Sequence, residues 1–295
     1  MLTPDQVADK RNGRPLGQVP QVATRITAFI AHNKLLFYLV CAWEEGFTGY
    51  VIDYGAFPDQ RRQYFTLRNA TRTLGRAFPG AGREGAVHAG LEKLASDLLP
   101  RPWTRTDGAV LRIERLLIDS GYLPGVCNAV CIKVGGATML SRGVGIRAGN
   151  KPMASYQRRP GERHGHNWYI PNVSRSNEFR HVAIDTNYWK TFVHARLATA
   201  AGDRGCLSLF GRKPEEHRRF AEHVADAETW TATEGRGRVL HEWRLKPAKP
   251  DNHWLDGLVG CAVAASMCGV SLGVGSEARP DRPRLRLSDI QKRRR

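Results

Sequence analysis

The sequence lacks several features that would place it in common protein classes. Its 295 residues include six cysteines but no Cys-x-x-Cys pair, so free thiols in a reducing compartment are expected rather than a disulfide framework. The first 15 residues contain no apolar run of the kind a secretory signal needs. There is no GxxxxGK[ST] phosphate loop, which excludes an ATP site of that type. The uncharged stretch 257–276 is rich in Gly, Ala and Ser, and we interpret it as a buried helix followed by a Gly-rich loop, not a membrane span.

Negative charge is scarce. The chain has 45 Lys and Arg against 28 Asp and Glu, a net charge of +17, and such a surface attracts polyanions. Residues 142–181 hold eight Lys or Arg against two acidic residues, together with aromatic side chains that can stack on bases. Residues 279–295 hold eight basic and two acidic residues. Nucleic acid is therefore the leading partner class. The alternative for any single basic residue is that it is simply a solvated residue on the surface.

Hydrophobic patterns predict an α/β fold. Three runs rich in β-formers, at 25–31, 35–43 and 47–54, predict an antiparallel meander whose first two strands are covered on both faces. Further helices and strands follow, with helices expected at 59–78, 84–99, 214–224 and 252–268 and strands at 111–118, 181–184, 206–210 and 239–245. This order indicates a mixed sheet with helices on both faces. We expect residues 1–23 to be a linker, 24–274 the folded domain, and 275–295 a basic tail.

Two carboxylates stand out by their place in these elements. Asp119 ends an apolar strand before Ser-Gly, at the rim of a sheet where ligands commonly bind; a turn or helix-cap aspartate is the alternative. Asp256 lies one turn into an almost wholly apolar helix, on the face of Asn252 and Gly260. A carboxylate on a buried face is costly unless it is paired or binds a cation. Two acids at one sheet edge suit a divalent-metal phosphodiesterase.

Several spaced motifs resemble those of lambda-type phage terminase large subunits. They are Glu242-Trp243-Arg244-Leu245, Asp251 to Asp256, Asp53-Tyr54-Gly55, Ile118 to Gly121 and Asp185 to Lys190. The resemblance implies the nuclease domain, a ribonuclease-H-like fold that cuts concatemeric double-stranded DNA with Mg²⁺ or Mn²⁺ in the bacterial host cytoplasm. It also implies, as partners, a separate or missing ATPase half, a terminase small subunit and a portal.

The resemblance also assigns roles to residues of this chain. Asp119 and Asp256 match the second and third metal ligands, Glu234 a family acid, and Lys190 a basic position near the site. The family's first aspartate lies on the opening strand, where this chain has Ala31, and His32 or Asn33 would be a weak substitute. We expect Asn252 and His32 to support the site, and the candidates for gripping DNA are Arg236, Arg238, Arg158, Arg159 and Arg163.

The sequence leaves three functions open. The first is a metal-dependent DNA endonuclease. The second is a catalytically impaired DNA-binding remnant of a prophage terminase, favoured by the replacement at Ala31. The third is an unrelated basic enzyme, which would gain support if Asp119 and Asp256 lay far apart.

Overall fold

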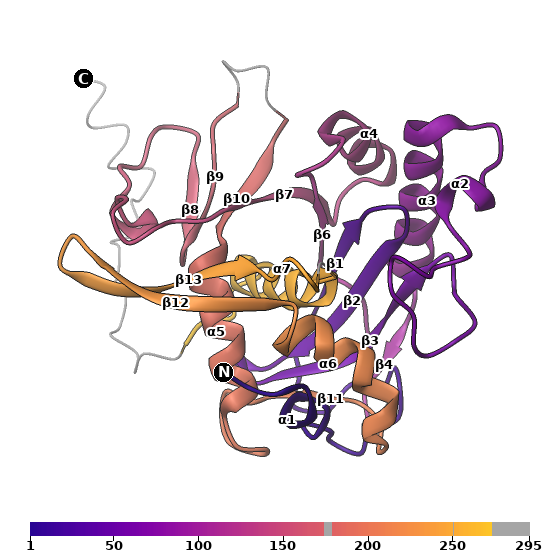
Figure 1. The fold of residues 1–295 in the computed structure, drawn as a ribbon, viewed down its shortest axis with the longest axis horizontal. Coiled ribbons are helices and arrows are strands. Elements are labelled where there is room, and N and C mark those ends of the chain that lie inside the picture. Colours follow the sequence, from indigo (N-terminus) through magenta and orange to yellow (C-terminus); the bar gives the residue numbers. More distant parts are fainter. Residues whose placement is uncertain (174–178, 250, 273–295) are drawn as a thin grey trace, which may run out of the picture.

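The fold is built on one large sheet. A computed structural model describes residues 1–173, 179–249 and 251–272 (Figure 1). The nine strands of the main sheet are ordered β11-β3-β2-β1-β6-β7-β10-β9-β8. Their bounds are β1 Arg25–His32, β2 Leu36–Trp43, β3 Gly49–Phe57, β6 Arg115–Asp119, β7 Thr138–Val144, β8 Arg163–Gly165, β9 Trp168–Ile170, β10 His181–Asp185 and β11 Leu207–Leu209. Two small hairpins are added, β4 Trp103–Thr104 with β5 Val110–Leu111, and β12 Glu228–Gly235 with β13 Arg238–Leu245.

Strand direction sets one functional edge. β1, β2 and β3 form the expected antiparallel meander, whereas β1, β6, β7 and β10 are mutually parallel neighbours. The carboxyl ends of those four strands therefore meet at the same edge of the sheet, where ligands of open α/β sheets commonly bind. This mixed arrangement agrees with the ribonuclease-H-like fold that the resemblance implies.

Helices cover both faces of the sheet, as the sequence predicts. The α-helices are α1 Pro4–Ala8, α2 Leu74–Ala77, α3 Gly82–Leu98, α4 Pro124–Val134, α5 Thr186–Ala198, α6 Arg218–Ala225 and α7 His253–Met267. Short 3-10 helices occur at Glu45–Phe47, Met153–Ser155 and Pro214–His217. α5, α6 and α7 share one apolar core with one face of the sheet, and α3 and α4 share a second core with the other. Alternate residues of β1 enter the two cores, Phe29 and Ala31 the first and Ala28 and Ile30 the second.

Three expectations differ from the structure or lie outside it. Residues 1–23 do not run as a free linker: Val7 of α1 is fully buried in the core of α6, and backbone bridges tie Arg11 to Leu209 and Val19 to Arg105. The expected helix at 59–78 is an irregular segment, with only α2 at its end. The expected tail at 275–295 lies outside the described residues. No helix in the described part of the chain is long and apolar enough to cross a membrane.

Helix α7 lies unusually close to the central strands because it presents glycine to them. A Cβ added at Gly260 would come within 1.8 Å of the Phe29 ring on β1, and one at Gly257 within 3.1 Å of Leu39 on β2. The hydroxyl of Thr27 donates a hydrogen bond of 2.9 Å to the Cys261 carbonyl, and the Trp43 indole donates to the same hydroxyl at 2.8 Å. Because these two glycines have no side chain, α7 packs directly on β1 and β2. This contact sets the distance between the sheet and the side chains that α7 carries.

We predict that Gly260→Ala destabilises the protein by at least about 1–3 kcal/mol, because the new methyl group overlaps Phe29 and forces α7 away from β1. Urea unfolding followed by circular dichroism measures the loss. Gly136→Ala is the matched control, since a Cβ there meets no atom within 4 Å. Equal stability of the two variants would contradict the close approach of helix and strand.

Candidate active site

Asp119 stands at the carboxyl end of β6, on the face of the sheet that α7 covers. Leu117 lies in the core shared with α7, and Asp119 is two residues further along the strand, so it belongs to the same face. The amide of Gly121 donates to its Oδ1 at 3.0 Å, which orients the carboxylate in the turn after the strand. The register pairs Ile30 with Ile118, which places Ala31 beside Asp119 at the next position of the neighbouring strand.

Asp256 in the first turns of α7 faces Lys190 of α5. The Lys190 ammonium lies 3.4 Å from Asp256 Oδ1 and also forms an ion pair with Glu228 at the start of β12. Asn252, just before α7, donates from Nδ2 to the same Glu228 carboxylate at 2.6 Å. The side chain of Lys190 is 11% exposed and that of Glu228 only 3%, whereas that of Asp256 is 34% exposed. Asp256 is thus the member of this cluster that a ligand can reach.

The electrostatics of the cluster join it to Asp119. Burial raises the pKa of Asp256 to about 6; the Lys190 cation opposes this, and the charges of Glu228 and Asp119 add to it. His253 at the start of α7 stacks on Phe37, the β2 partner of Ala31, and α7 contacts β6, so Asp256 lies toward the edge of the sheet where Asp119 stands. The electrostatic effect of Asp119 on Asp256 agrees with this placement. Burial alone would lower the pKa of Lys190, but Asp256 and Glu228 outweigh it and the pKa is raised. The two carboxylates therefore favour the charged form of Lys190.

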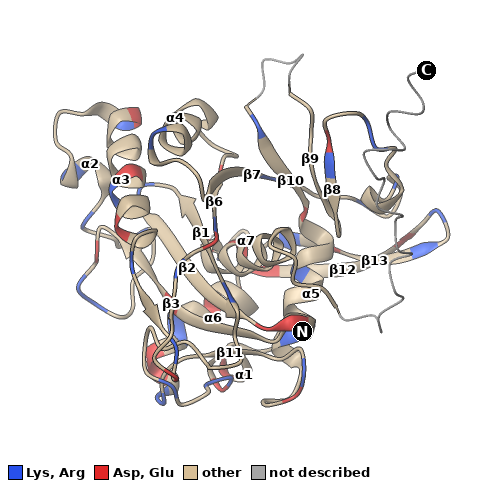
Figure 2. Ribbon diagram, turned by 180° about the vertical axis from the view of Figure 1, so that it is seen from behind, with Lys and Arg blue, Asp and Glu red and all other residues tan. Residues whose placement is uncertain are grey.

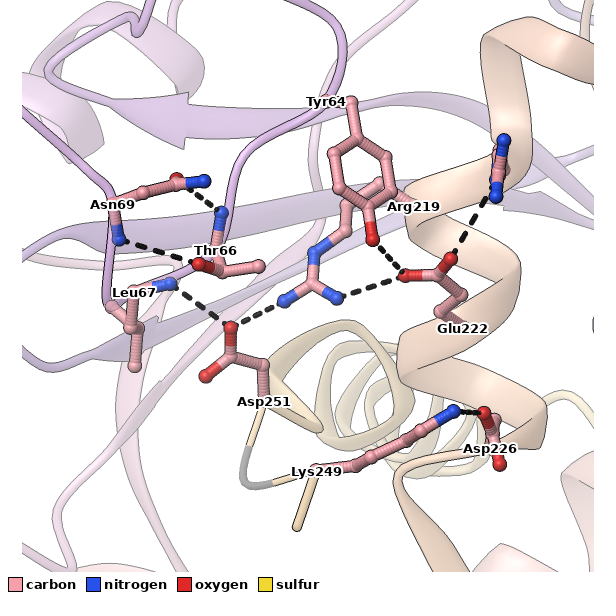
Figure 3. A network of polar contacts seen from close by, with 10 residues as sticks. Tyr64, Thr66, Leu67, Asn69, Arg219, Glu222, Asp226, Lys249 and Asp251 are labelled. Carbon is pink, nitrogen blue, oxygen red and sulfur yellow. Dashed lines mark hydrogen bonds and ion pairs between the residues drawn. The ribbon is translucent and has the colours of Figure 1, made fainter.

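A second polar network holds the start of α7 in place (Figure 3). Asp251 accepts a hydrogen bond of 2.9 Å from the Leu67 amide and forms an ion pair with Arg219 of α6. Arg219 also pairs with Glu222 at 3.0 Å, and the Tyr64 hydroxyl donates to Glu222 at 2.9 Å. The irregular segment containing residues 64–67 is thus tied to both helices, and the network fixes the end of α7 from which Asp256 projects.

The other candidate residues differ in where they lie relative to the Lys190, Glu228 and Asp256 cluster. Glu234 is exposed and lies six residues beyond Glu228 on β12, about 20 Å along the strand, so it is not brought to Asp256. Asn252 does support the cluster through Glu228. His32 belongs to the opposite face of the sheet, where its Nε2 lies 3.2 Å from Cys127 Sγ; burial lowers its pKa, with Asp119 opposing.

Glu228 is the member of the cluster that sequence reasoning missed. It belongs to a strand without clear alternation, and its partner Lys190 is distant in the sequence. No local pattern distinguishes it from the surface acids around it. Its burial is decided by tertiary contacts, with Lys190 of α5 and with Asn252 just before α7.

The candidate arginines lie in and beside the β12–β13 hairpin, which projects from the body of the protein (Figures 1 and 2). Arg236 is exposed in its turn, and Arg238 donates to the backbone carbonyls of Arg147 and Asn150. Gly235 also packs closely on residues 148–149. Three further candidates follow that loop and are also exposed, namely Arg158, Arg159 and Arg163. Figure 2 shows basic residues at the hairpin tip and on β8.

Two motifs that carry the family resemblance build the contact between this hairpin and α5. The Asn187 side chain accepts from the Trp243 amide at 2.9 Å and donates to the Ile146 carbonyl at 3.1 Å. The Trp243 indole donates to Thr191, and Glu242 accepts from the Ala148 amide at 3.1 Å. These residues position the hairpin and do not touch the acids.

Asp119 and Asp256, here called the acidic cluster, offer a divalent cation two carboxylate ligands rather than three. Among the described residues, no group of three or more His, Cys, Asp or Glu side chains is arranged to hold a metal ion. Asp119 and Asp256 supply two carboxylates, and Ala31 puts a methyl group beside Asp119. Two carboxylates fit Mg²⁺, because that ion usually keeps several waters and binds through one or two carboxylates together with substrate phosphates.

The fold and this cluster define an α/β protein with an acidic candidate active site at the carboxyl edge of its sheet. The sequence profile of the terminase large subunit gpA endonuclease domain matches residues 2–278, nearly the whole chain. The chain therefore belongs to this family of terminase endonuclease domains, as the motifs indicate. Searches of curated proteins and of solved structures found no match.

We predict that Lys190→Met destabilises the protein by about 3–5 kcal/mol, because it leaves the Glu228 carboxylate buried without its cation. Chemical unfolding at pH 7.5 measures the loss. Lys249→Met is the control: Lys249 pairs with Asp226 at the surface, where an ion pair contributes at most about 1 kcal/mol. Similar effects of the two substitutions would show that the Lys190 cluster is not a buried charge network.

Proposed function

We propose that this chain is a nuclease that cuts concatemeric double-stranded DNA during genome packaging, using Mg²⁺ or Mn²⁺ held by Asp119 and Asp256. The observation that carries the proposal is that Asp119 and Asp256 both belong to the α7 face of the sheet and lie toward the same edge, with the Asp256 side chain partly exposed. We also propose that the domain works in the bacterial host cytoplasm with an ATPase half, a terminase small subunit and a portal. Family membership and the charge of +17 support DNA as the substrate.

The roles of the residues follow from their surroundings. A bound divalent cation would supply Lewis-acid polarisation of the scissile phosphate and a lowered pKa for the attacking water. Asp119 and Asp256 would hold it, while Lys190 keeps Asp256 ionised and in place through the pair at 3.4 Å. Exposed Arg158, Arg159 and Arg236 would contact backbone phosphates on the flank.

We predict that Asp119→Asn and Asp256→Asn each lower metal-dependent nicking of a supercoiled plasmid at least about 100-fold. Removing a residue that only supports a metal ligand costs about 10- to 100-fold, and removing a ligand itself should cost at least as much. Both variants should still bind duplex DNA, since neither removes a basic group. Asp97→Asn is the control, because Asp97 is an exposed acid of α3 paired with Lys93. Cleavage at the wild-type rate by both site variants would refute the assignment of the site.

A second candidate function is duplex binding without cleavage. The specific observation that favours it is Ala31, which is 2% exposed and stands beside Asp119 on the α7 face, where a third carboxylate would complete the cluster. Loss of one ligand weakens a metal site but leaves the basic surface intact. Salt-sensitive duplex binding with no nicking in Mg²⁺ or Mn²⁺ would establish this second function.

We predict that Ala31→Asp increases cleavage and the thermal stabilisation produced by Mn²⁺, because the new carboxylate lies beside Asp119. Without metal the variant should melt below the wild type, since an unpaired carboxylate at a buried position is costly. Thermal scanning with and without Mn²⁺, together with plasmid nicking, measures both effects. Ala31→Asn has a similar volume and no charge, and an equal response in the two variants would count against a ligand position at Ala31.

A further inference from the structure

A concave site lies at the same edge as Asp119, on the opposite face of the sheet. It is a cavity of about 700 Å³ between the β1–β2 turn, α2, the start of α3 and the turn after β6. Its walls include the basic side chains of Lys34 and Arg83, the rings of His32 and Tyr122, and apolar groups of α2 and α3. None of the residues that line it is acidic. Its volume is that of a small-molecule site, and its charge favours an anion.

His32 brings an unused polar atom to this cavity. The residue is 7% exposed, and its Nε2 contacts Cys127 Sγ, but its Nδ1 is buried without a hydrogen-bond partner among the described residues. A buried ring nitrogen without a partner is costly, and most such groups in folded proteins have one. A ligand in the cavity would supply the missing partner.

The start of α3 adds backbone amides without a side-chain cap on another side of the cavity. This helix of 17 residues begins at Gly82, and its N-cap residue Ala81 provides no side-chain hydrogen bond to the first turn. A Cβ at Gly82 would meet no atom within 4 Å, so a ligand can approach the backbone closely. The backbone amides at a helix N-terminus and the positive end of the helix dipole bind phosphate groups.

The cavity and the acidic cluster are connected through the ends of β1 and β6. His32 is the last residue of β1, directly after Ala31, and Tyr122 follows Asp119 by three residues. The rings of His32 and Tyr122 lie 5.8 Å apart, and the Arg83 guanidinium lies 4.8 Å from the centre of the Tyr122 ring. A DNA strand held at Asp119 would need to continue only over the ends of β1 and β6 to reach this cavity.

We propose that this cavity binds one nucleotide of the substrate strand next to the site of cleavage, with its phosphate at the start of α3 between Lys34 and Arg83. The proposal rests on the proposed function, because it uses a strand bound at Asp119. Tyr122, which is 39% exposed, offers a ring edge and face to the sugar and base. His32 donates to or accepts from the nucleotide at Nδ1.

The first test measures salt dependence. Lys34→Ala and Arg83→Ala should each weaken binding of a fluorescent 20-bp duplex in anisotropy titrations and reduce the slope of log K against log[salt] by about 0.9, the value for one phosphate contact. Lys93→Ala is the matched control, an exposed lysine of α3 outside the cavity that pairs with Asp97. Equal slopes for the three variants would overturn the proposal while leaving the nuclease function intact; a wild-type protein that binds no duplex would overturn the nuclease function itself.

The second test fills the cavity without removing a charge. Gly75 lines it, and a Cβ there meets no atom within 4 Å, so Gly75→Phe places a ring in open space and Gly75→Ala is its control. We expect Gly75→Phe, but not Gly75→Ala, to weaken duplex binding and plasmid nicking about tenfold. The melting temperature of both variants should equal that of the wild type. Wild-type duplex binding by Gly75→Phe overturns the proposal. If calorimetry also shows that this variant has lost binding of thymidine monophosphate, the cavity holds free nucleotides rather than the DNA strand.

Discussion

The Lys190 ammonium, buried between Glu228 and Asp256, is the interaction on which the arrangement of the site depends. It joins three elements far apart in the chain, since Lys190 lies on α5, Glu228 on β12 and Asp256 on α7. A charge in this position is tolerated only when it is paired, so the three elements must meet in one geometry. The same pair also keeps Asp256 ionised, which is the form that a divalent cation needs. The carboxylate that supports the packing of α7 is therefore the same one that the proposed metal site would use.

The fold and the chemistry place different demands on β1. The core between β1 and α7 requires a small group where Gly260 meets Phe29, and Ala31 continues that apolar face. A third metal ligand would instead be an acid beside Asp119, a group that is costly at a buried position until a cation binds. An alanine there keeps the sheet intact while it removes a ligand. Membership of the endonuclease family and catalytic competence are therefore separate physical properties of this chain.

Much of the fold could be predicted because strong local patterns specify it. The antiparallel meander, its burial on both faces, α3 and α7 all follow from runs of apolar residues long enough to exclude alternatives. The pattern at 59–78 predicts a helix, but the segment is irregular, since the Leu67 amide bonds to Asp251 and the Tyr64 hydroxyl bonds to Glu222. α4 and β12 were not predicted; α4 is only partly buried and β12 is mostly exposed, so neither shows clear periodicity.

The sequence by itself determined the charge of the protein, the class of its sheet and the two acids Asp119 and Asp256, because residue type and strand or helix position are local properties. Only the tertiary structure decided that Glu228 completes the Lys190 cluster, that Glu234 lies away from it, and that His32 faces a cavity on the other side of the sheet. Those outcomes depend on which elements pack together and on which face of a strand a residue lies. Both are set by burial of the whole chain, which no short stretch of sequence encodes.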